Sequence, residues 1–198
     1  MHEEQKGFDF AQEGDSLIIA NNQTLAPVDT VVVQSVKWFN EGYQEIRIDG
    51  EIDSGVRVGF GVENKTWNAS LKFINNVVEK NRARGVLFST RGKVYVSRNT
   101  FSTMMAAISI TGDNNYWFES GPSTSVSIIQ NHFINCTSGG AGNAVIRIAP
   151  VIKNPELITD GEYYSAKFVI SINYFEAFDN ALLFVRSVEQ LSFTHNTI

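Results

Sequence analysis

The chain has 198 residues, 43% of them hydrophobic and 19% charged, which is enough to bury a core and excludes a disordered segment. Its net charge of −5 leaves no basic surface to neutralise a phosphate backbone, which argues against nucleic acid as a partner. The apolar runs are far shorter than the roughly 20 residues of a membrane-spanning helix, so we expect no membrane insertion.

The single cysteine, Cys136, excludes an internal disulfide framework. No CxxC motif and no Cys/His ligand spacing is present, so we predict no metal site. Cys136 is interpreted as a small, buried, apolar side chain.

Residues 1–62 are predicted to form a small antiparallel β-barrel or sheet. Apolar strands at 16–20, 30–36 and 44–49 are separated by turns rich in Asn, Asp and Gly. Residues 56–63 are expected to lead the chain into a second domain over residues 63–198. No stretch has a convincing helical period, so the predicted fold class is all-β.

A short repeat runs through the second domain. It is an alternating strand followed by Asn, any residue and an apolar residue, and the spacings between successive Asn residues are 23, 32, 42 and 23. The repeated asparagines are Asn76, Asn99, Asn131, Asn173 and Asn196. A basic period of 23 lies within the range of solenoid proteins. We expect each Asn to occupy a left-handed turn position and to stack on the next as an amide ladder.

Each period also contains a second apolar strand, at residues 85–88, 107–110, 144–148 and 181–185. Two or three short strands per period indicate the coils of a right-handed parallel β-helix. The two longer spacings then require loops, which we place at residues 112–121 and 151–164.

The chain stops two residues after its last repeated Asn, without a polar cap. A solenoid buries its core only by stacking, so its terminal coils normally carry a cap. We therefore expect an internal fragment of a longer β-helix, with the N-terminal domain inserted between coils. Self-association through the uncapped end is expected as well.

Two segments resemble glycoside hydrolase family 110, the bacterial exo-acting α-1,3-galactosidases that include enzymes cleaving blood group B. The first is Glu-Lys-Asn-Arg-Ala-Arg-Gly-Val-Leu-Phe-Ser-Thr at 79–90, and the second is Gly-Asp-Asn-Asn-Tyr-Trp-Phe-Glu-Ser-Gly at 112–121. The resemblance implies a β-helix with embedded β-barrel domains, terminal α-galactosyl glycans as substrates, and a parent protein in the periplasm or outside the cell. It also implies hydrolysis with inversion and without a cofactor.

An inverting glycosidase uses one carboxylic acid and one carboxylate base. In the family these are aspartates, including an Asp-Asp pair, on coils before the matched region, and this chain has no Asp-Asp pair. We therefore expect no catalytic residue in the chain, with Asp113 and Glu119 as the fallback acid and base.

The predicted substrate-binding residues lie in the two matching segments. Arg82 and Arg84 flank a solenoid turn that would be simpler with Asn or Gly, and guanidinium groups suit multidentate bonds to sugar hydroxyls. Ion pairing with Glu79 is the structural alternative. In the second segment, Trp117 has either a sugar face or its own loop to pack on, and Asp113 and Glu119 would accept bonds from sugar hydroxyls or cap the loop.

Two other functions remain open. A non-catalytic β-helix, such as an adhesin or a phage tailspike segment, would bind glycans or only build a rod. A polysaccharide lyase would need acidic calcium ligands beside a basic residue, and no such cluster is evident.

Overall fold

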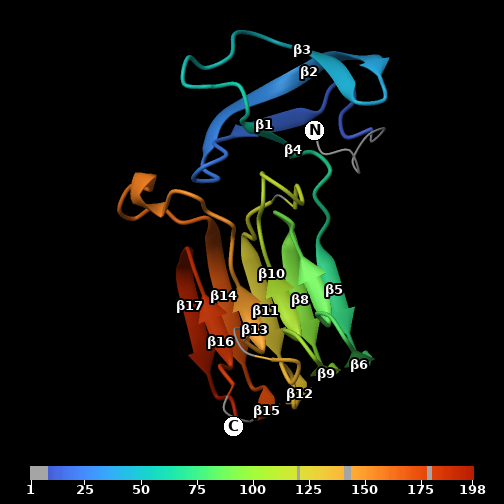
Figure 1. Ribbon diagram of the computed structural model, residues 1–198, viewed down its shortest axis with the longest axis vertical. Helices are drawn as coiled ribbons and strands as arrows, with labels where there is room; N and C mark the ends of the chain where they lie inside the picture. The colour runs from blue at the N-terminus through green and yellow to red at the C-terminus, as the bar shows by residue number, and fades with distance from the viewer. Residues whose placement is uncertain (1–8, 120, 141–143, 178–179) are drawn as a thin grey trace. The chain divides into compact units, whose positions relative to one another are not determined.

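A computed structural model describes residues 9–119, 121–140, 144–177 and 180–198. The chain divides into two compact units, shown in Figure 1, and each is described by itself. The first unit comprises Met1–Asn68, Asp113–Phe118 and Ile152–Ile158. The second comprises Ala69–Gly112, Glu119–Val151 and Thr159–Ile198. Two short segments from the loops of the repeat region thus belong to the N-terminal unit.

The first unit contains an antiparallel sheet in the order β3-β2-β1-β4. Its strands are β1 (Ser16–Ala20), β2 (Pro27–Asn40), β3 (Tyr43–Ile48) and β4 (Gly61–Asn64). The three predicted strands are present, although β2 has 14 residues and extends beyond both predicted ends. Residues 56–63 were predicted to lead the chain into the second domain, but part of this segment belongs to the sheet itself. Residues 61–64 form β4, which pairs with the edge of the buried strand β1 that β2 leaves open.

The second unit is a parallel β-helix, which confirms the predicted all-β fold class. Its strands form three parallel sheets, in the orders β17-β14-β11-β8-β5, β15-β12-β9-β6 and β16-β13-β10-β7 (Figure 1). The strands are β5 (Leu71–Ile74), β6 (Val77–Asn81), β7 (Val86–Phe88), β8 (Lys93–Ser97), β9 (Thr100–Thr103), β10 (Ile108–Ile110), β11 (Ser125–Ile129), β12 (His132–Ile134), β13 (Ile146–Ile148), β14 (Ser165–Ser171), β15 (Tyr174–Glu176), β16 (Leu183–Val185) and β17 (Val188–Thr194).

The core of the β-helix is a stack of identical or similar side chains, because the period of the sequence matches the period of the coils. Ile108 and Ile146, for example, are in register on β10 and β13, and both are fully buried. Phenylalanine rings form a second stack, in which the Phe133 centroid lies 5.4 Å from that of Phe101 and 4.8 Å from that of Phe175. Cys136 is buried as predicted, and burial raises the pKa of its thiol.

The predicted amide ladder is confirmed. The backbone N–H and the side-chain Nδ2 of each repeated Asn donate to Oδ1 of the Asn in the next coil, from Asn76 through to Asn196. In the middle of the ladder, Asn99 and Asn131 are almost fully buried. Register between coils is therefore fixed by buried side-chain hydrogen bonds as well as by the apolar core.

The left-handed position was placed one residue too late. The positive φ angles occur at the residues immediately before the repeated asparagines: Asn75 at 58°, Arg98 at 54°, Gln130 at 59°, Ile172 at 58° and His195 at 55°. A left-handed residue there aims the following Asn along the stack, where its amide completes the ladder. The ladder therefore selects Asn, while the turn position accepts varied residues at a conformational cost.

Ile172 carries the largest such cost, because a β-branched side chain is a poor left-handed residue. The side chain is 57% exposed and contributes little to the core. We expect Ile172→Asn to raise the free energy of unfolding by about 1 kcal/mol, measured by urea denaturation. Val77→Asn is the control, because Val77 is 67% exposed on β6 and lacks a positive φ. A gain in the control equal to that at position 172 would contradict the strain argument.

Candidate functional site

A tight turn between β6 and β7 presents the two arginines of the first segment. The side chain of Asn81 holds this turn: its Nδ2 donates to the carbonyl O of Arg84 at 2.7 Å, and its Oδ1 accepts from the backbone N–H of Ala83 at 3.2 Å. Gly85 allows the next coil to approach, because a Cβ there would lie 2.5 Å from the carbonyl O of Ala107. Asn81 and Gly85 are thus structural, and they leave Arg82 and Arg84 exposed.

The alternative interpretation of these arginines, ion pairing with Glu79, is not realised. Among the residues that the structure describes, no ion pair joins Glu79 to Arg82 or Arg84. The two guanidinium groups therefore remain available for a ligand.

Arg147 on β13 is a residue that the sequence argument missed. It lies in the middle of an apolar strand, between the buried Ile146 and Ile148, so strand alternation turns its side chain outward. The signal was a charged residue inside an apolar run, at 144–149. Burial lowers the pKa of the Arg147 guanidinium, and the positive charge of Arg84 lowers it further. The charge of Arg147 on β13 is therefore repelled by that of Arg84, which lies in the turn before β7.

Asp113 caps its own loop. Its Oδ1 accepts from the backbone N–H groups of Asn115 at 2.7 Å and Tyr116 at 3.2 Å, and its Oδ2 accepts from that of Trp117 at 3.1 Å. Asp113 is 3% exposed. A carboxylate that is buried and engaged through both oxygens is poorly placed to exchange a proton with a substrate.

The capped loop presents aromatic rings. Trp117 is 58% exposed and Tyr116 is 54% exposed, with ring centroids 4.7 Å apart in an edge-to-face arrangement. An exposed indole ring is suited to stacking on a sugar ring. The loop is anchored in the first unit, because Asn115 Nδ2 donates to the carbonyl O of Asn22 at 2.9 Å.

Glu119 follows this loop but belongs to the second unit, where it is half-buried. Ser120 lies outside the described residues. The structure thus brings Asp113 and Trp117 together in the first unit, and it places Arg82, Arg84 and Glu119 in the second. The fallback acid and base, Asp113 and Glu119, fall in different units.

A second insertion reaches the same turn of the first unit. The backbone N–H groups of Lys153 and Asn154 donate to the carbonyl O of Gln23, and Asn154 Nδ2 donates to Gln23 Oε1 at 2.8 Å. Both predicted loops therefore contribute to the unit that contains the N-terminal sheet, which composition alone did not indicate.

Among the described ranges, no three His, Cys, Asp or Glu side chains gather as a metal site would require. No helix in those ranges has the length and apolar character needed to cross a bilayer. His132 Nε2 lies 2.6 Å from Glu176 Oε1 on the outside of the helix, a pair that the sequence argument did not foresee.

Comparison with known proteins identifies the relatives of this chain. A family model described as GLAA-B beta-barrel domain II matches residues 1–59. An α-1,3-galactosidase B from Parabacteroides distasonis is 36% identical over the whole chain, which covers 34% of that protein. The whole length of the chain aligns with part of an α-1,3-galactosidase. An α-1,3-galactosidase B from Akkermansia muciniphila is also 36% identical, with 25% of its length covered, and an α-1,3-galactosidase A from Bacteroides fragilis is 33% identical, with 33% covered.

These matches confirm the resemblance predicted from the two segments. The chain spans about a third or less of the length of these curated α-1,3-galactosidases. The GLAA-B barrel match covers β1, β2 and β3 of the first unit.

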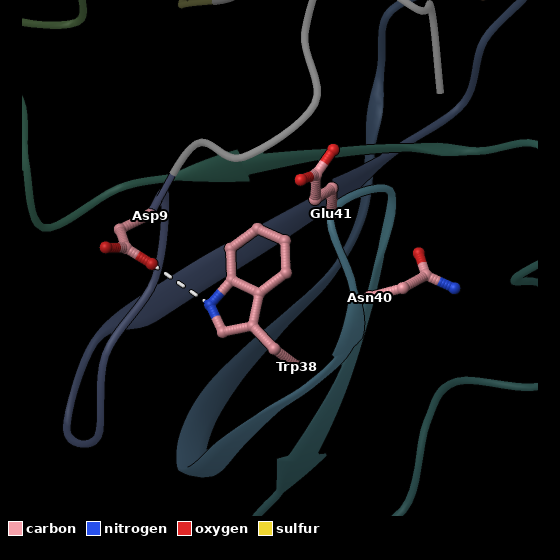
Figure 2. A pocket seen from close by; sticks show the side chains of 4 residues that line it. All are labelled: Asp9, Trp38, Asn40 and Glu41. Atoms are coloured by element: carbon pink, nitrogen blue, oxygen red, sulfur yellow. Dashed lines mark hydrogen bonds between the residues drawn. The ribbon is translucent and has the colours of Figure 1, made fainter.

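The GLAA-B barrel region contains one further hollow, of about 360 Å³, lined by Asp9, Trp38, Asn40 and Glu41 (Figure 2). Trp38 Nε1 donates to Asp9 Oδ1 at 3.1 Å, so the polar edge of the indole is already satisfied. None of these residues stood out in the sequence, and the hollow is shallow and open.

Proposed function

We propose that this chain is part of a glycoside hydrolase that removes terminal α-1,3-linked galactose from glycans with inversion of configuration. In this proposal the chain supplies scaffold coils and part of the substrate pocket. The observation that carries it is the turn at residues 81–85, where Asn81 and Gly85 hold two exposed guanidinium groups on a solenoid that matches α-1,3-galactosidases throughout.

The proposed role of the arginines follows from their chemistry. A guanidinium group offers five N–H donors in a fixed plane, which suits the paired hydroxyls of a sugar. The coils hold the backbone beneath these donors rigidly, so their orientation costs little on binding. Trp117, on its own capped loop, offers a ring face of the kind that packs against the apolar side of a sugar.

The proposed acid and base come from other coils of a longer protein. Inversion requires two carboxyl groups about 6.5 to 9.5 Å apart, with room for a water molecule. Asp113 does not meet this requirement, since both of its oxygens hold the loop. We propose that the longer protein acts in the periplasm or outside the cell, as the resemblance implies.

The test is release of galactose from an α-1,3-galactosyl oligosaccharide by this chain, beside a form extended on its N-terminal side through the preceding coils. We expect only the extended form to release galactose. Turnover by the chain alone would overturn the proposal that the acid and base lie on other coils. Asp113 and Glu119 would then be the first residues to replace. Failure of both forms, with folding verified by circular dichroism, would overturn the galactosidase proposal in favour of a non-catalytic glycan-binding β-helix.

A further inference from the structure

The outer face of the sheet β16-β13-β10-β7 carries a row of side chains in register. Leu87, Ser109, Arg147 and Phe184 occupy equivalent positions on β7, β10, β13 and β16. Their flanking residues on β10 and β13 point into the core, so the row faces away from it. Ser109 is only 1% exposed, so the short side chain at the middle of the row is covered, while Leu87 and Phe184 are 38% and 49% exposed.

Arg147 is held in place by its neighbour in the row. Its guanidinium carbon lies 5.7 Å from the centroid of the Phe184 ring. Contact with an aromatic face fixes the plane of a guanidinium group and leaves its N–H edges available. Arg147 is half-buried, so its charge is partly removed from water.

A second positive charge approaches this row from one end. Arg84 lies two residues before Val86 on β7. Val86 is in register with Ile108 on β10, and Ile108 is in register with Ile146 on β13, next to Arg147. Arg147 itself is in register with Leu87 on β7, three residues after Arg84. Two strand spacings and three residues along the strand together separate the two backbones by about 14 Å, a gap that two extended arginine side chains can close. Within the described residues, neither guanidinium group forms an ion pair with a carboxylate. Arg84 is exposed and Arg147 is half-buried, and two neighbouring positive charges without a counter-ion favour the binding of an anion between them.

We propose that Arg84 and Arg147 together bind an acidic group, a carboxylate or a sulfate, carried by a glycan, with Phe184 packing against the adjoining sugar ring. Arginine is suited to bidentate bonds with both kinds of anion. The inference rests on the proposed function only in that the ligand is a glycan. It adds a preference for acidic glycans, for which Arg147 is the specific determinant.

Equilibrium binding tests the proposal without requiring turnover. Isothermal titration calorimetry would compare a neutral α-galactosyl oligosaccharide, the same oligosaccharide with one sulfate or one carboxylate, and inorganic sulfate alone. We expect either acidic oligosaccharide to bind about tenfold more tightly than the neutral one, the contribution of one charge-assisted contact. Inorganic sulfate should bind more weakly than the acidic oligosaccharides, because it lacks the sugar ring.

Arg147→Gln should remove the tenfold preference for the acidic oligosaccharides. Lys167→Gln removes the same charge from an exposed position on another sheet and should keep the preference. Equal affinity for neutral and acidic ligands would overturn the proposal, as would loss of preference in the Lys167 variant. Inorganic sulfate binding as tightly as the sulfated glycan would also overturn it, in favour of a site for free anions. If the acidic preference holds and the extended form releases no galactose, only the proposed hydrolase function fails.

Discussion

Replacing Asn131 by alanine is expected to lower the free energy of unfolding of the β-helix by about 4 kcal/mol. Asn131 is 2% exposed and lies at the centre of the amide ladder. Its Oδ1 accepts from both the backbone N–H and Nδ2 of Asn99, and its Nδ2 donates to Oδ1 of Asn173 and to the carbonyl O of Val96. Removing the side chain therefore leaves the buried backbone N–H of Asn99 without its acceptor, and it removes one hydrogen bond each from Asn99 Nδ2, Asn173 Oδ1 and the carbonyl O of Val96.

Asn196→Ala is the matched control. Asn196 accepts from Asn173 in the same way, but it is the last Asn of the ladder and is half-exposed, so water can satisfy the groups it leaves. We expect a loss of about 1 kcal/mol there. Urea denaturation followed by circular dichroism would measure both values, with tryptophan fluorescence as a second probe of two-state behaviour. Equal losses at the two positions would contradict the claim that the buried ladder holds the coils in register.

The sequence predicted the β-helix well because the repeat appears in two independent signals. The alternating apolar residues indicated strands, and the five asparagines gave their register, so spacings of 23, 32, 42 and 23 located both inserted loops. The pattern did not predict which residue of each turn has a positive φ angle. The left-handed residue precedes the Asn and varies from Asn75 to Ile172, so composition gives no sign of it.

The candidate site was only partly predictable from the sequence. Arg82 and Arg84 stood out because they interrupt a turn, but the structural work of Asn81 and Gly85 in the same segment became clear only from the hydrogen bonds and close contacts. Arg147 could have been found as a charge inside an apolar strand. Its approach to Arg84 could not, because that depends on the register of three strands separated by loops of different length.

The central claim is that the turn at residues 81–85 contacts the glycan, and Arg84 is its most direct test. Arg84→Gln keeps a polar side chain of moderate length and leaves the Asn81 hydrogen bond to the backbone O of residue 84 intact. It removes the charge and most of the N–H donors that would bind sugar hydroxyls. In the N-terminally extended form, we expect this change to cost about 2 kcal/mol of transition-state stabilisation on a neutral substrate.

The measurement is kcat/KM for galactose release from a neutral α-1,3-galactosyl oligosaccharide by the extended form, its Arg84→Gln variant and its Lys167→Gln variant. The account predicts a fall of about 30-fold for Arg84→Gln and no change for Lys167→Gln, with the same unfolding midpoint in all three proteins. An Arg84→Gln variant with the full kcat/KM of the parent would contradict the claim that this chain forms part of the substrate pocket.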